Sequence, residues 1–365
     1  MTADPRLPNP AQFMARALRL AERGSLTTHP NPRVGCVVVR DGTVVGEGWH
    51  ERAGEPHAEV HALRRAGERA RGSDVFVNLE PCCHHGRTPP CTDALIAAGV
   101  RKVWVGMTDP NPQVAGQGLA RLRAAGIEVV DGIAEAEART LNRGFVSRMA
   151  RRRPWVTLKL AASLDGRTAM ASGESRWITG AEARADVHRL RARAGAVVTG
   201  VGTILADDPQ LTARDVPGPV RQPDRIVLDS RARAPLSAQV WAEGARRFWV
   251  SSVTAQGCPA QVHAIRVPPA TDGSLDLGAA LAALAEHEVN EVLVECGSRL
   301  AGALLQQSLV DELVLYLAPS LLGQGARPLA SLTGVERLDQ KLRLEWIDVR
   351  RIGGDLRVTA RPVTE

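Results

Sequence analysis

The feature that most constrains this chain is a His-x-Glu triplet, His57-Ala58-Glu59, followed by a Pro-Cys pair, Pro81-Cys82, and by another cysteine, Cys91. One imidazole and two thiolates fill three of the four positions around a tetrahedral Zn²⁺ ion. The fourth position stays open to a water molecule, which zinc can convert to hydroxide near neutral pH. The pattern therefore predicts a catalytic metal site rather than a closed structural one.

The candidate ligands are expected at the starts of elements, where they can converge. Pro56 suits a first helical position, because its missing N–H would be unpaired there, so a helix over about 56–70 would carry His57 and Glu59 in its first turn. Glu59 does not share the direction of His57 and is expected beside the metal-bound water. There it would carry a proton from the water to a departing nitrogen, which indicates hydrolytic deamination.

The spacing of the cysteines leaves alternatives open. Eight residues separate Cys82 from Cys91, whereas the deaminase signature has two between its cysteines; the nearer candidate, Cys83, is adjacent to Cys82 and would be strained as a second ligand. A closed structural zinc knot, or buried thiols without a metal, would have no use for Glu59. A protease-type pair of His57 and His61 would need glutamate at position 58, which is alanine.

Polar residues on either side of this motif are candidates for a substrate pocket. Each of them is as readily explained as a loop residue with a structural hydrogen bond. They are Asn31, His50, His84 and Arg87.

Length and composition limit the class of protein. A chain of 365 residues suggests two domains. The net charge is +6, but the arginines are scattered along the chain and offset by 40 acidic residues. Only 3% of residues are aromatic, which leaves few side chains on which nucleic-acid bases could stack. A small anionic substrate is therefore favoured over nucleic acid. No apolar run is long enough to cross a bilayer and no secretory signal is evident, so a cytoplasmic protein with reduced cysteines and no membrane partner is expected.

Residues 12–130 alternate between helical and strand patterns. This alternation predicts a mostly parallel sheet with helices on both faces, and ligands collect at the carboxyl ends of such strands, where Glu80-Pro81-Cys82 falls. The predicted helices cover 12–23, 56–70, 94–98 after an opening at Cys91, and 119–125, and the predicted strands cover 34–39, 43–48 after an Asp41-Gly42 turn, 74–79, 102–106 and 128–130.

The alternation lapses over 139–153, which places a first domain at 1–147 and a second at 154–365. In the second domain, Thr179-Gly180-Ala181-Glu182 resembles a capping box for a helix that runs to about 194. The last two strands are expected to be antiparallel. The predicted strands cover 155–160, 196–199, 225–228, 247–250, 291–294, 313–317, 342–347 and 356–358.

Two glycine-rich turns in the second domain fall short of the dinucleotide fingerprint. Gly200-Val201-Gly202 has Leu205 where the third glycine belongs, and the segment from Gly297 to Gly302 has Arg299 in place of the second glycine. Gly297 nevertheless follows a strand and opens a helix over 300–307, whose amides and dipole can hold a pyrophosphate. A plain turn between strand and helix explains the same glycines.

The first half of the chain resembles the bifunctional deaminase/reductase family of riboflavin biosynthesis. The matching residues are Asn31-Pro32-Arg33-Val34-Gly35, His57-Ala58-Glu59, Glu80-Pro81-Cys82 and Pro89-Pro90-Cys91, with the long insert between the cysteines. The resemblance implies Zn²⁺ on His57, Cys82 and Cys91 with Glu59 as proton shuttle. It implies that zinc hydroxide replaces the 2-amino group of 2,5-diamino-6-ribosylamino-4(3H)-pyrimidinone 5′-phosphate.

The second half resembles the reductase domain of the same family. The matching segments are 159–166, 172–178, 202–209 and 295–297. The resemblance implies two α/β domains, a cytidine-deaminase-like three-layer α/β/α domain followed by a dihydrofolate-reductase-like domain, which uses NADPH to reduce the ribosyl group to ribityl. It implies NADPH contacts at Ala161, Trp177, Thr203, Asp207, Ser230, Gly297, Ser298, Arg299, Leu300, Ala301, Gly302 and Ala303, and substrate contacts at Ser175, Arg191, Leu211, Arg214 and Glu295.

Of the substrate contacts that the resemblance implies, Arg191 and Arg214 can hold the 5′-phosphate through bidentate guanidinium contacts. The pattern around Arg191 alone would indicate a solvated helix face. A homo-oligomer is also expected. Two other functions stay open: a nucleic-acid-editing zinc deaminase with an appended binding domain, and a zinc-stabilised interaction protein without catalysis. Salt-dependent RNA binding would favour the former, and unfolding by chelators without any ammonia release would favour the latter.

Overall fold

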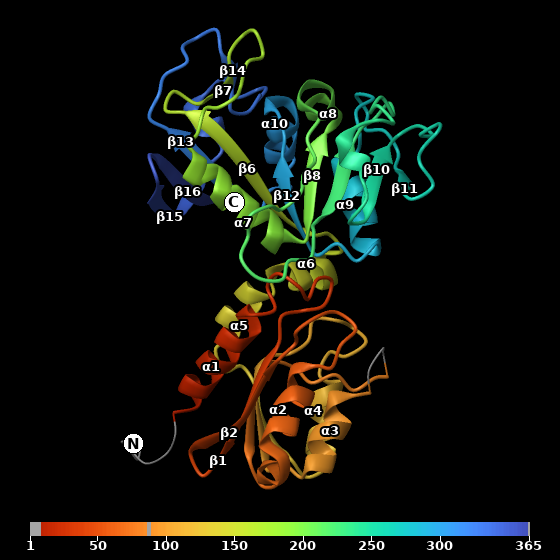
Figure 1. The fold of residues 1–365 in the computed structure, drawn as a ribbon, viewed down its shortest axis with the longest axis vertical. Helices are drawn as coiled ribbons and strands as arrows, with labels where there is room; N and C mark the ends of the chain where they lie inside the picture. Colours follow the sequence, from red (N-terminus) through yellow and green to blue (C-terminus); the bar gives the residue numbers. More distant parts are fainter. Residues whose placement is uncertain (1–8, 86–88, 364–365) are drawn as a thin grey trace. The chain divides into compact units, whose positions relative to one another are not determined.

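A computed structural model describes residues 9–85 and 89–363, and in it the chain divides into two units, Met1–Arg152 and Arg153–Glu365 (Figure 1). Helix α6 (Arg143–Arg151) closes the first unit, so the boundary predicted at about 147 falls inside a helix. The segment 139–153, over which the alternation lapses, contains the end of helix α5 (Glu135–Leu141) and the whole of α6.

The N-terminal unit contains a five-stranded sheet in the order β2-β1-β3-β4-β5. Its strands are β1 (Gly35–Arg40), β2 (Thr43–Trp49), β3 (Asp74–Leu79), β4 (Lys102–Met107) and β5 (Glu128–Val130). The prediction of a mostly parallel sheet was wrong, because β1 runs antiparallel to both β2 and β3, and the remaining pairs are parallel. A two-residue turn at Asp41-Gly42, with φ of 50° and 75°, can join only antiparallel neighbours.

Helices cover both faces of this sheet, as predicted. Helix α1 (Pro10–Glu22) packs Met14, Ala17 and Leu20 against one face, and helices α2, α3 and α4 pack against the other. Figure 1 shows α1 on the opposite side of the strands from α2, α3 and α4. These three helices cover Ala58–Ala66, Cys91–Ala98 and Gln117–Ala124, and a 3-10 turn, η1, covers Gly67–Ala70.

Helix α2 lies very close to strand β2. A Cβ atom added at Gly48 would lie 2.4 Å from the carbonyl oxygen of Ala58, and one added at Gly46 would lie 2.2 Å from that of Ala62. Side chains at these two positions would push the helix off the sheet. The glycines therefore set the position of the α2 start, where His57 and Glu59 lie.

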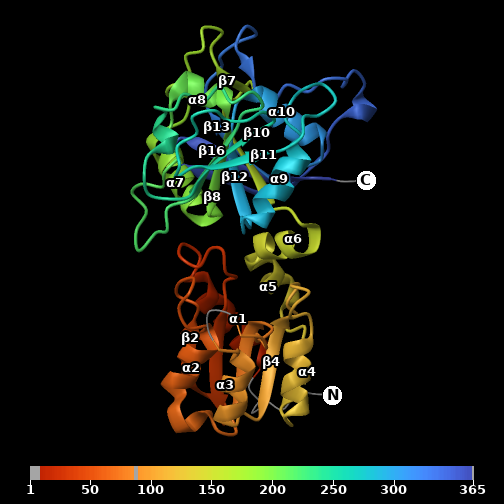
Figure 2. The same cartoon turned by 90° about the vertical axis from the view of Figure 1, so that its right-hand side faces the viewer.

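The C-terminal unit contains a nine-stranded sheet in the order β11-β10-β9-β8-β12-β6-β13-β16-β15 (Figure 1). Figure 2 shows helix α7 (Ala181–Ala194) on the opposite side of this sheet from helices α9 (Leu277–Glu286) and α10 (Ser298–Gln306). The strands from β11 to β13 are parallel, and β16 and β15 form the predicted antiparallel pair at one edge. The strands are β6 (Trp155–Ser163), β8 (Ala196–Gly200), β9 (Asp224–Leu228), β10 (Arg247–Ser251), β11 (His263–Arg266), β12 (Glu291–Glu295), β13 (Glu312–Ala318), β15 (Leu344–Ile352) and β16 (Asp355–Pro362).

Helices cover this second sheet on both faces. Helices α9 and α10 bury Leu281, Leu284 and Leu304 against one face, while α7 packs Val187 against Tyr316 on the other. A separate two-stranded sheet pairs β7 (Arg167–Ala169) with β14 (Arg327–Pro328). The helices are α7 (Ala181–Ala194), α8 (Val201–Asp207), α9 (Leu277–Glu286) and α10 (Ser298–Gln306), with 3-10 turns η2 (Gln239–Trp241) and η3 (Leu338–Gln340).

The N-cap residues of helices α2 and α7 differ from the sequence predictions. Helix α2 begins at Ala58 rather than Pro56, with His57 as an extended N-cap residue at ψ 166°. The predicted capping box at Thr179 was wrong: Gly180 is the N-cap of α7, and its N–H donates to the Asp355 carboxylate at 2.7 Å. A carboxylate distant in sequence replaces the local cap there.

Over residues 9–85 and 89–363, no helix combines the length and the apolar character that crossing a bilayer requires.

We predict that Gly48→Ala lowers the free energy of unfolding of the N-terminal unit by about 1–3 kcal/mol, because the added methyl group meets backbone atoms of α2. Differential scanning calorimetry of the full chain measures the change. Gly354→Ala is the matched control, since a Cβ atom there meets no described residue within 4 Å. An equal effect of both substitutions would contradict the close-packing explanation.

Candidate active sites

Three potential metal ligands meet in the N-terminal unit. His57 caps α2, Cys82 follows the end of β3, and Cys91 is the first residue of α3. Their ligand atoms all lie within 4.8 Å of one another. The Nδ1 atom of His57 is 3.2 Å from the sulfur of Cys91 and 3.6 Å from that of Cys82. The fold therefore brings together the three residues of the predicted zinc site.

The local electrostatics suit a cation. A hydrogen bond from the Cys91 thiol lowers the pKa of Cys82 to about 4, and the same interaction raises the pKa of Cys91. The backbone N–H of Cys91 also donates to the Cys82 sulfur at 3.3 Å. One sulfur of the pair thus ionises readily. An imidazole with two sulfur ligands, one of them an easily formed thiolate, is a donor set that Zn²⁺ prefers.

Glu59 is buried beside these ligands, with 3% of its surface exposed. Within the described residues, its Oε2 atom has no hydrogen-bond partner. Burial raises the pKa of Glu59 above its ordinary value. A buried carboxylate oxygen without a partner is costly unless a bound group completes its contacts. The orphaned oxygen is therefore an independent sign that something binds at this point.

His50 and Asn31 lie next to the metal ligands. Burial lowers the pKa of His50 to about 4, so the ring is neutral at pH 7. Its Nδ1 pairs with the carbonyl oxygen of Pro56 at 3.2 Å, and its Nε2 accepts from the amide of Asn31 at 3.0 Å. The His50 and His57 rings stand edge to face with centroids 5.3 Å apart. This arrangement fixes the direction of both predicted pocket residues.

Two asparagines that the sequence analysis did not single out hold the loop after Asn31. Asn78 accepts from the N–H of Gly35 at 2.8 Å and donates to the carbonyl oxygen of Arg33 at 3.0 Å. Asn142 accepts from the N–H of Arg33 at 2.7 Å and donates to its carbonyl oxygen at 3.0 Å. Asn78 was detectable, because it interrupts the apolar strand β3.

The insert between the cysteines contributes less to this site. His84 is exposed, so the structure does not bring it into the group around His57. Arg87 lies outside the described residues.

The C-terminal unit holds a cluster of three charged side chains that are largely buried, each with 14% of its side-chain surface exposed. Arg191 on α7 forms two hydrogen bonds with Glu295 at the end of β12, at 2.5 and 3.0 Å. The ammonium group of Lys159 on β6 is 3.7 Å from the same carboxylate. Burial alone would raise the pKa of Glu295, but Arg191 and Lys159 lower it to about 2. Lys159 was missed by the sequence analysis, although a lysine inside an apolar strand was the signal.

Arg191 also contacts the segment that carries Leu211 and Arg214. The carbonyl oxygen of Thr212 accepts from Arg191 at 3.1 Å and lies 3.2 Å from Nδ1 of His188. Leu211 is 2% exposed and has a φ of 55°, whereas Arg214 is exposed. Both arginines were expected to bind one phosphate group. In the structure, the guanidinium group of Arg191 forms two hydrogen bonds with Glu295, whereas Arg214 is exposed to solvent.

The predicted cofactor residues follow neighbouring strands. Thr203 and Asp207 lie on α8 after β8, Ser230 follows β9, and Gly297 follows β12 as the N-cap of α10. These strands are adjacent in the sheet and parallel, so their carboxyl ends lie at one edge. Ala161 lies on β6 next to β12.

The start of α10 is open, which fits a phosphate group. In the described part of the chain, no side-chain hydrogen bond caps the helix at Gly297, and a Cβ atom added there would meet no atom within 4 Å. Gly302 has a different role, because a Cβ atom there would lie 2.0 Å from the carbonyl oxygen of Ser331. Of the remaining predicted residues, Trp177 is 70% exposed and Ser175 is half-buried in the same loop.

Comparisons with known proteins match both units. Residues 8–107 match the cytidine and deoxycytidylate deaminase zinc-binding region, and residues 154–358 match the RibD C-terminal domain. The riboflavin biosynthesis protein RibD of Escherichia coli is 52% identical over 94% of this chain and 97% of its own length. The Haemophilus influenzae protein of the same name is 44% identical over 96% of each chain.

Solved structures agree along nearly the whole chain. One is RibD of Acinetobacter baumannii, with 45% identity, a TM-score of 0.90, and coverage of 97% of this chain and 99% of that chain. Another is a diaminohydroxyphosphoribosylaminopyrimidine deaminase/5-amino-6-(5-phosphoribosylamino)uracil reductase from Thermotoga maritima, with 34% identity, a TM-score of 0.86 and the same coverage. Together with the zinc-ligand group His57, Cys82 and Cys91, these matches establish that the chain belongs to the RibD family of riboflavin biosynthesis enzymes, which are deaminases and reductases.

Proposed function

We propose that the N-terminal unit hydrolyses the 2-amino group of 2,5-diamino-6-ribosylamino-4(3H)-pyrimidinone 5′-phosphate, and that the C-terminal unit then reduces the ribosyl group to ribityl with NADPH. The product would be 5-amino-6-ribitylamino-uracil 5′-phosphate. The observation that carries the proposal is the buried Glu59 carboxylate beside three zinc-ligand atoms, with one oxygen that has no partner among the residues the structure describes. The name of the Thermotoga maritima relative describes the same two activities for that protein.

In the deaminase site, His57, Cys82 and Cys91 would hold zinc. Zinc, when bound, lowers the pKa of a coordinated water and acts as a Lewis acid. Glu59 takes a proton from the attacking water and delivers it to the departing amino group, so that a C–O bond replaces a C–N bond and ammonia leaves. Neutral His50 and its partner Asn31 would bind polar edges of the pyrimidine, and His84 is proposed as a further substrate contact.

In the reductase site, Glu295 and Arg191 would bind the substrate together with Ser175, Leu211 and Arg214. The cofactor NADPH supplies a hydride when bound. The open amides at Gly297 suit its pyrophosphate. The residues proposed to contact NADPH are Ala161, Trp177, Thr203, Asp207, Ser230 and Gly297, Ser298, Arg299, Leu300, Ala301, Gly302 and Ala303. The cluster of Arg191, Glu295 and Lys159 keeps charged groups in fixed positions where the sugar would lie.

The two activities can be separated by mutation. We predict that Glu59→Ala lowers the rate of ammonia release at least about 100-fold, because general acid–base catalysis is lost. The same variant keeps its zinc and reduces the already deaminated compound at the wild-type rate. Ammonia release, zinc content and NADPH oxidation are measured on one preparation. Loss of both activities in a folded variant would contradict two independent sites.

Arg214 is the exposed arginine of the proposed phosphate site. We predict that Arg214→Gln raises KM for the phosphorylated reductase substrate by about 10-fold or more, because a charge-assisted contact is lost. The kcat value changes little. Arg266→Gln, another exposed arginine of this unit, is the control and leaves KM unchanged. An equal loss with the dephosphorylated substrate would show that Arg214 does not bind the phosphate.

We also propose that the chain forms a homo-oligomer through strand β15. This strand ends the nine-stranded sheet, and Trp346, Ile347 and Val349 on it are 66%, 44% and 57% exposed. An exposed apolar edge strand is a natural place for another chain to pair. Acidic Glu345 precedes basic Arg351 along β15, so an antiparallel second copy would bring opposite charges together.

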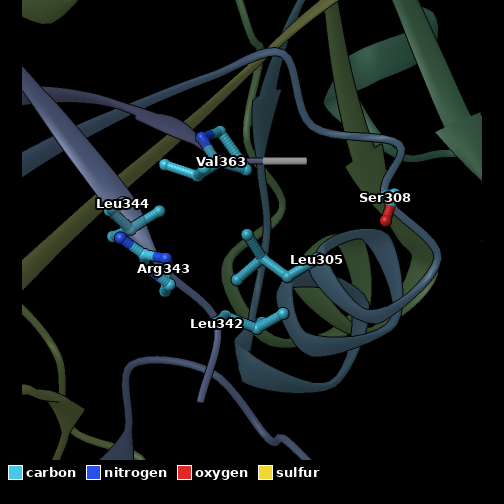
Figure 3. A pocket seen from close by; sticks show the side chains of 7 residues that line it. Leu305, Ser308, Leu342, Arg343, Leu344 and Val363 are labelled. Atoms are coloured by element: carbon cyan, nitrogen blue, oxygen red, sulfur yellow. The ribbon is translucent and has the colours of Figure 1, made fainter. Parts of the chain in front are cut away.

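A pocket beside this edge adds to the apolar surface. It has a volume of about 270 Å³ and lies between the end of α10 and the start of β15. Figure 3 shows Leu305, Leu342 and Val363 gathered around it. A second copy would cover both features.

We predict that the wild-type chain is a dimer or larger in light scattering and that Trp346→Glu shifts it toward the monomer, because a charge replaces the apolar contact. Leu236→Glu, at a residue that is 51% exposed between β9 and η2, leaves the assembly intact. A monomeric wild-type chain would refute the proposal.

A further inference from the structure

Glu80 is a buried carboxylate that neither proposed reaction uses. It follows β3 and is separated from the zinc ligand Cys82 by Pro81 alone. Its residue surface is 3% exposed. A buried charge of this kind is retained only when its hydrogen-bonding capacity is filled.

Four backbone N–H groups fill that capacity. Oε2 accepts from Asp109 at 3.0 Å and from Gly116 at 2.9 Å. Oε1 accepts from Gly118 at 2.9 Å and from Leu119 at 3.2 Å. All four donors belong to the segment 109–119, which leads into α4. The negative charge also lies at the α4 N-terminus, where the helix dipole stabilises it.

The backbone itself is in contact at the same point. A Cβ atom added at Gly118 would lie 2.2 Å from the carbonyl oxygen of Pro81. The peptide unit that precedes Cys82 therefore rests directly on the start of α4. Movement of α4 away from Glu80 would release Pro81 and Cys82 together.

A second, weaker link joins α4 to the other cysteine ligand, Cys91. Arg121 on α4 donates to the carbonyl oxygen of Cys83 at 3.2 Å and pairs with Asp93 at 2.6 Å. Asp93 lies in the first turn of α3, which begins at Cys91. Both side chains are more than 40% exposed, so this pair contributes little energy. Glu80 is the stronger of the two links.

We propose that Glu80 is a positioning residue for the zinc centre: its carboxylate fastens α4 and the segment 109–119 behind Cys82 and so keeps the sulfur ligand in its coordinating position. Residues that orient metal ligands typically change metal affinity by about 10- to 100-fold when they are replaced. The effect would act through the backbone around Pro81, without any contact of Glu80 with the metal.

A purely stabilising role for Glu80 predicts a different result. In that case its loss would lower the unfolding temperature, and the folded protein would keep the wild-type rate of zinc release and the wild-type metal spectrum. A positioning role changes both of these properties at temperatures where the protein stays folded.

The test uses the full-length, zinc-loaded chain and Glu80→Gln, which keeps the shape of the side chain but turns one acceptor oxygen into a donor that faces N–H groups. We expect zinc transfer to a chromogenic chelator to become about 10- to 100-fold faster, with an unchanged circular dichroism spectrum at the assay temperature. In the cobalt-substituted protein we expect altered ligand-field bands. Glu128→Gln, which removes the exposed partner of Lys102 in the same unit, is the matched control and leaves both readouts unchanged.

Gly118→Ala disturbs the contact between α4 and Pro81 while Glu80 stays in place. It replaces Glu80→Gln as the test variant if Glu80→Gln does not fold. The added methyl group meets the Pro81 carbonyl oxygen, so zinc release should again become faster. Arg121→Met should change the rate by less than about 3-fold, as expected for an exposed ion pair. The proposal would be overturned if folded Glu80→Gln released zinc at the wild-type rate and gave the wild-type cobalt spectrum. If Glu80→Gln does not fold, the same result for Gly118→Ala would overturn it.

Discussion

The close packing of helix α2 on strand β2 is the constraint on which the deaminase site depends. Gly46 and Gly48 let two backbones meet where any side chain would collide. That contact places His57 and Glu59, at the start of α2, over the sheet whose strand β3 leads to Cys82. A metal site tolerates little displacement of its ligands. The distance between helix α2 and the sheet therefore determines the positions of the metal-site residues.

The carboxylates inside the two units differ in how many of their oxygen atoms have hydrogen-bond or ion-pair partners. This difference distinguishes a carboxylate that supports the fold from one that can take part in a reaction. Glu80 is filled by four backbone amides, and Glu295 is matched by Arg191 and Lys159. Glu59 keeps an oxygen without a partner in the described part of the chain. A carboxylate filled by backbone amides, such as Glu80, holds structure in place. One paired with cations, such as Glu295, keeps its charge in a fixed position, and one with an unpaired oxygen, such as Glu59 in the described part of the chain, can exchange a proton with a bound molecule.

The errors of the sequence analysis share a physical cause. Helix and strand identities follow from periodicity, which is local, and most elements were predicted within a few residues. The first sheet was expected to be mostly parallel, but β1 is antiparallel to β3, far along the chain, as well as to β2 across the predicted Asp41-Gly42 turn. The α7 capping box was replaced by Asp355, far along the chain. In both cases the pairing of strands or the approach of a distant side chain prevailed over a local pattern.

The sequence by itself determined the zinc-ligand types, the proton-carrying candidate beside them and the family to which the chain belongs, because these follow from residue identities at short spacings. Tertiary structure alone decided that Lys159 joins Arg191 and Glu295, that Asn142 holds the loop after Asn31, and that Glu80 fastens α4 behind Cys82. Such contacts join residues from separate elements. Their partners are chosen by how sheets and helices pack, and no pattern along a single segment contains that information.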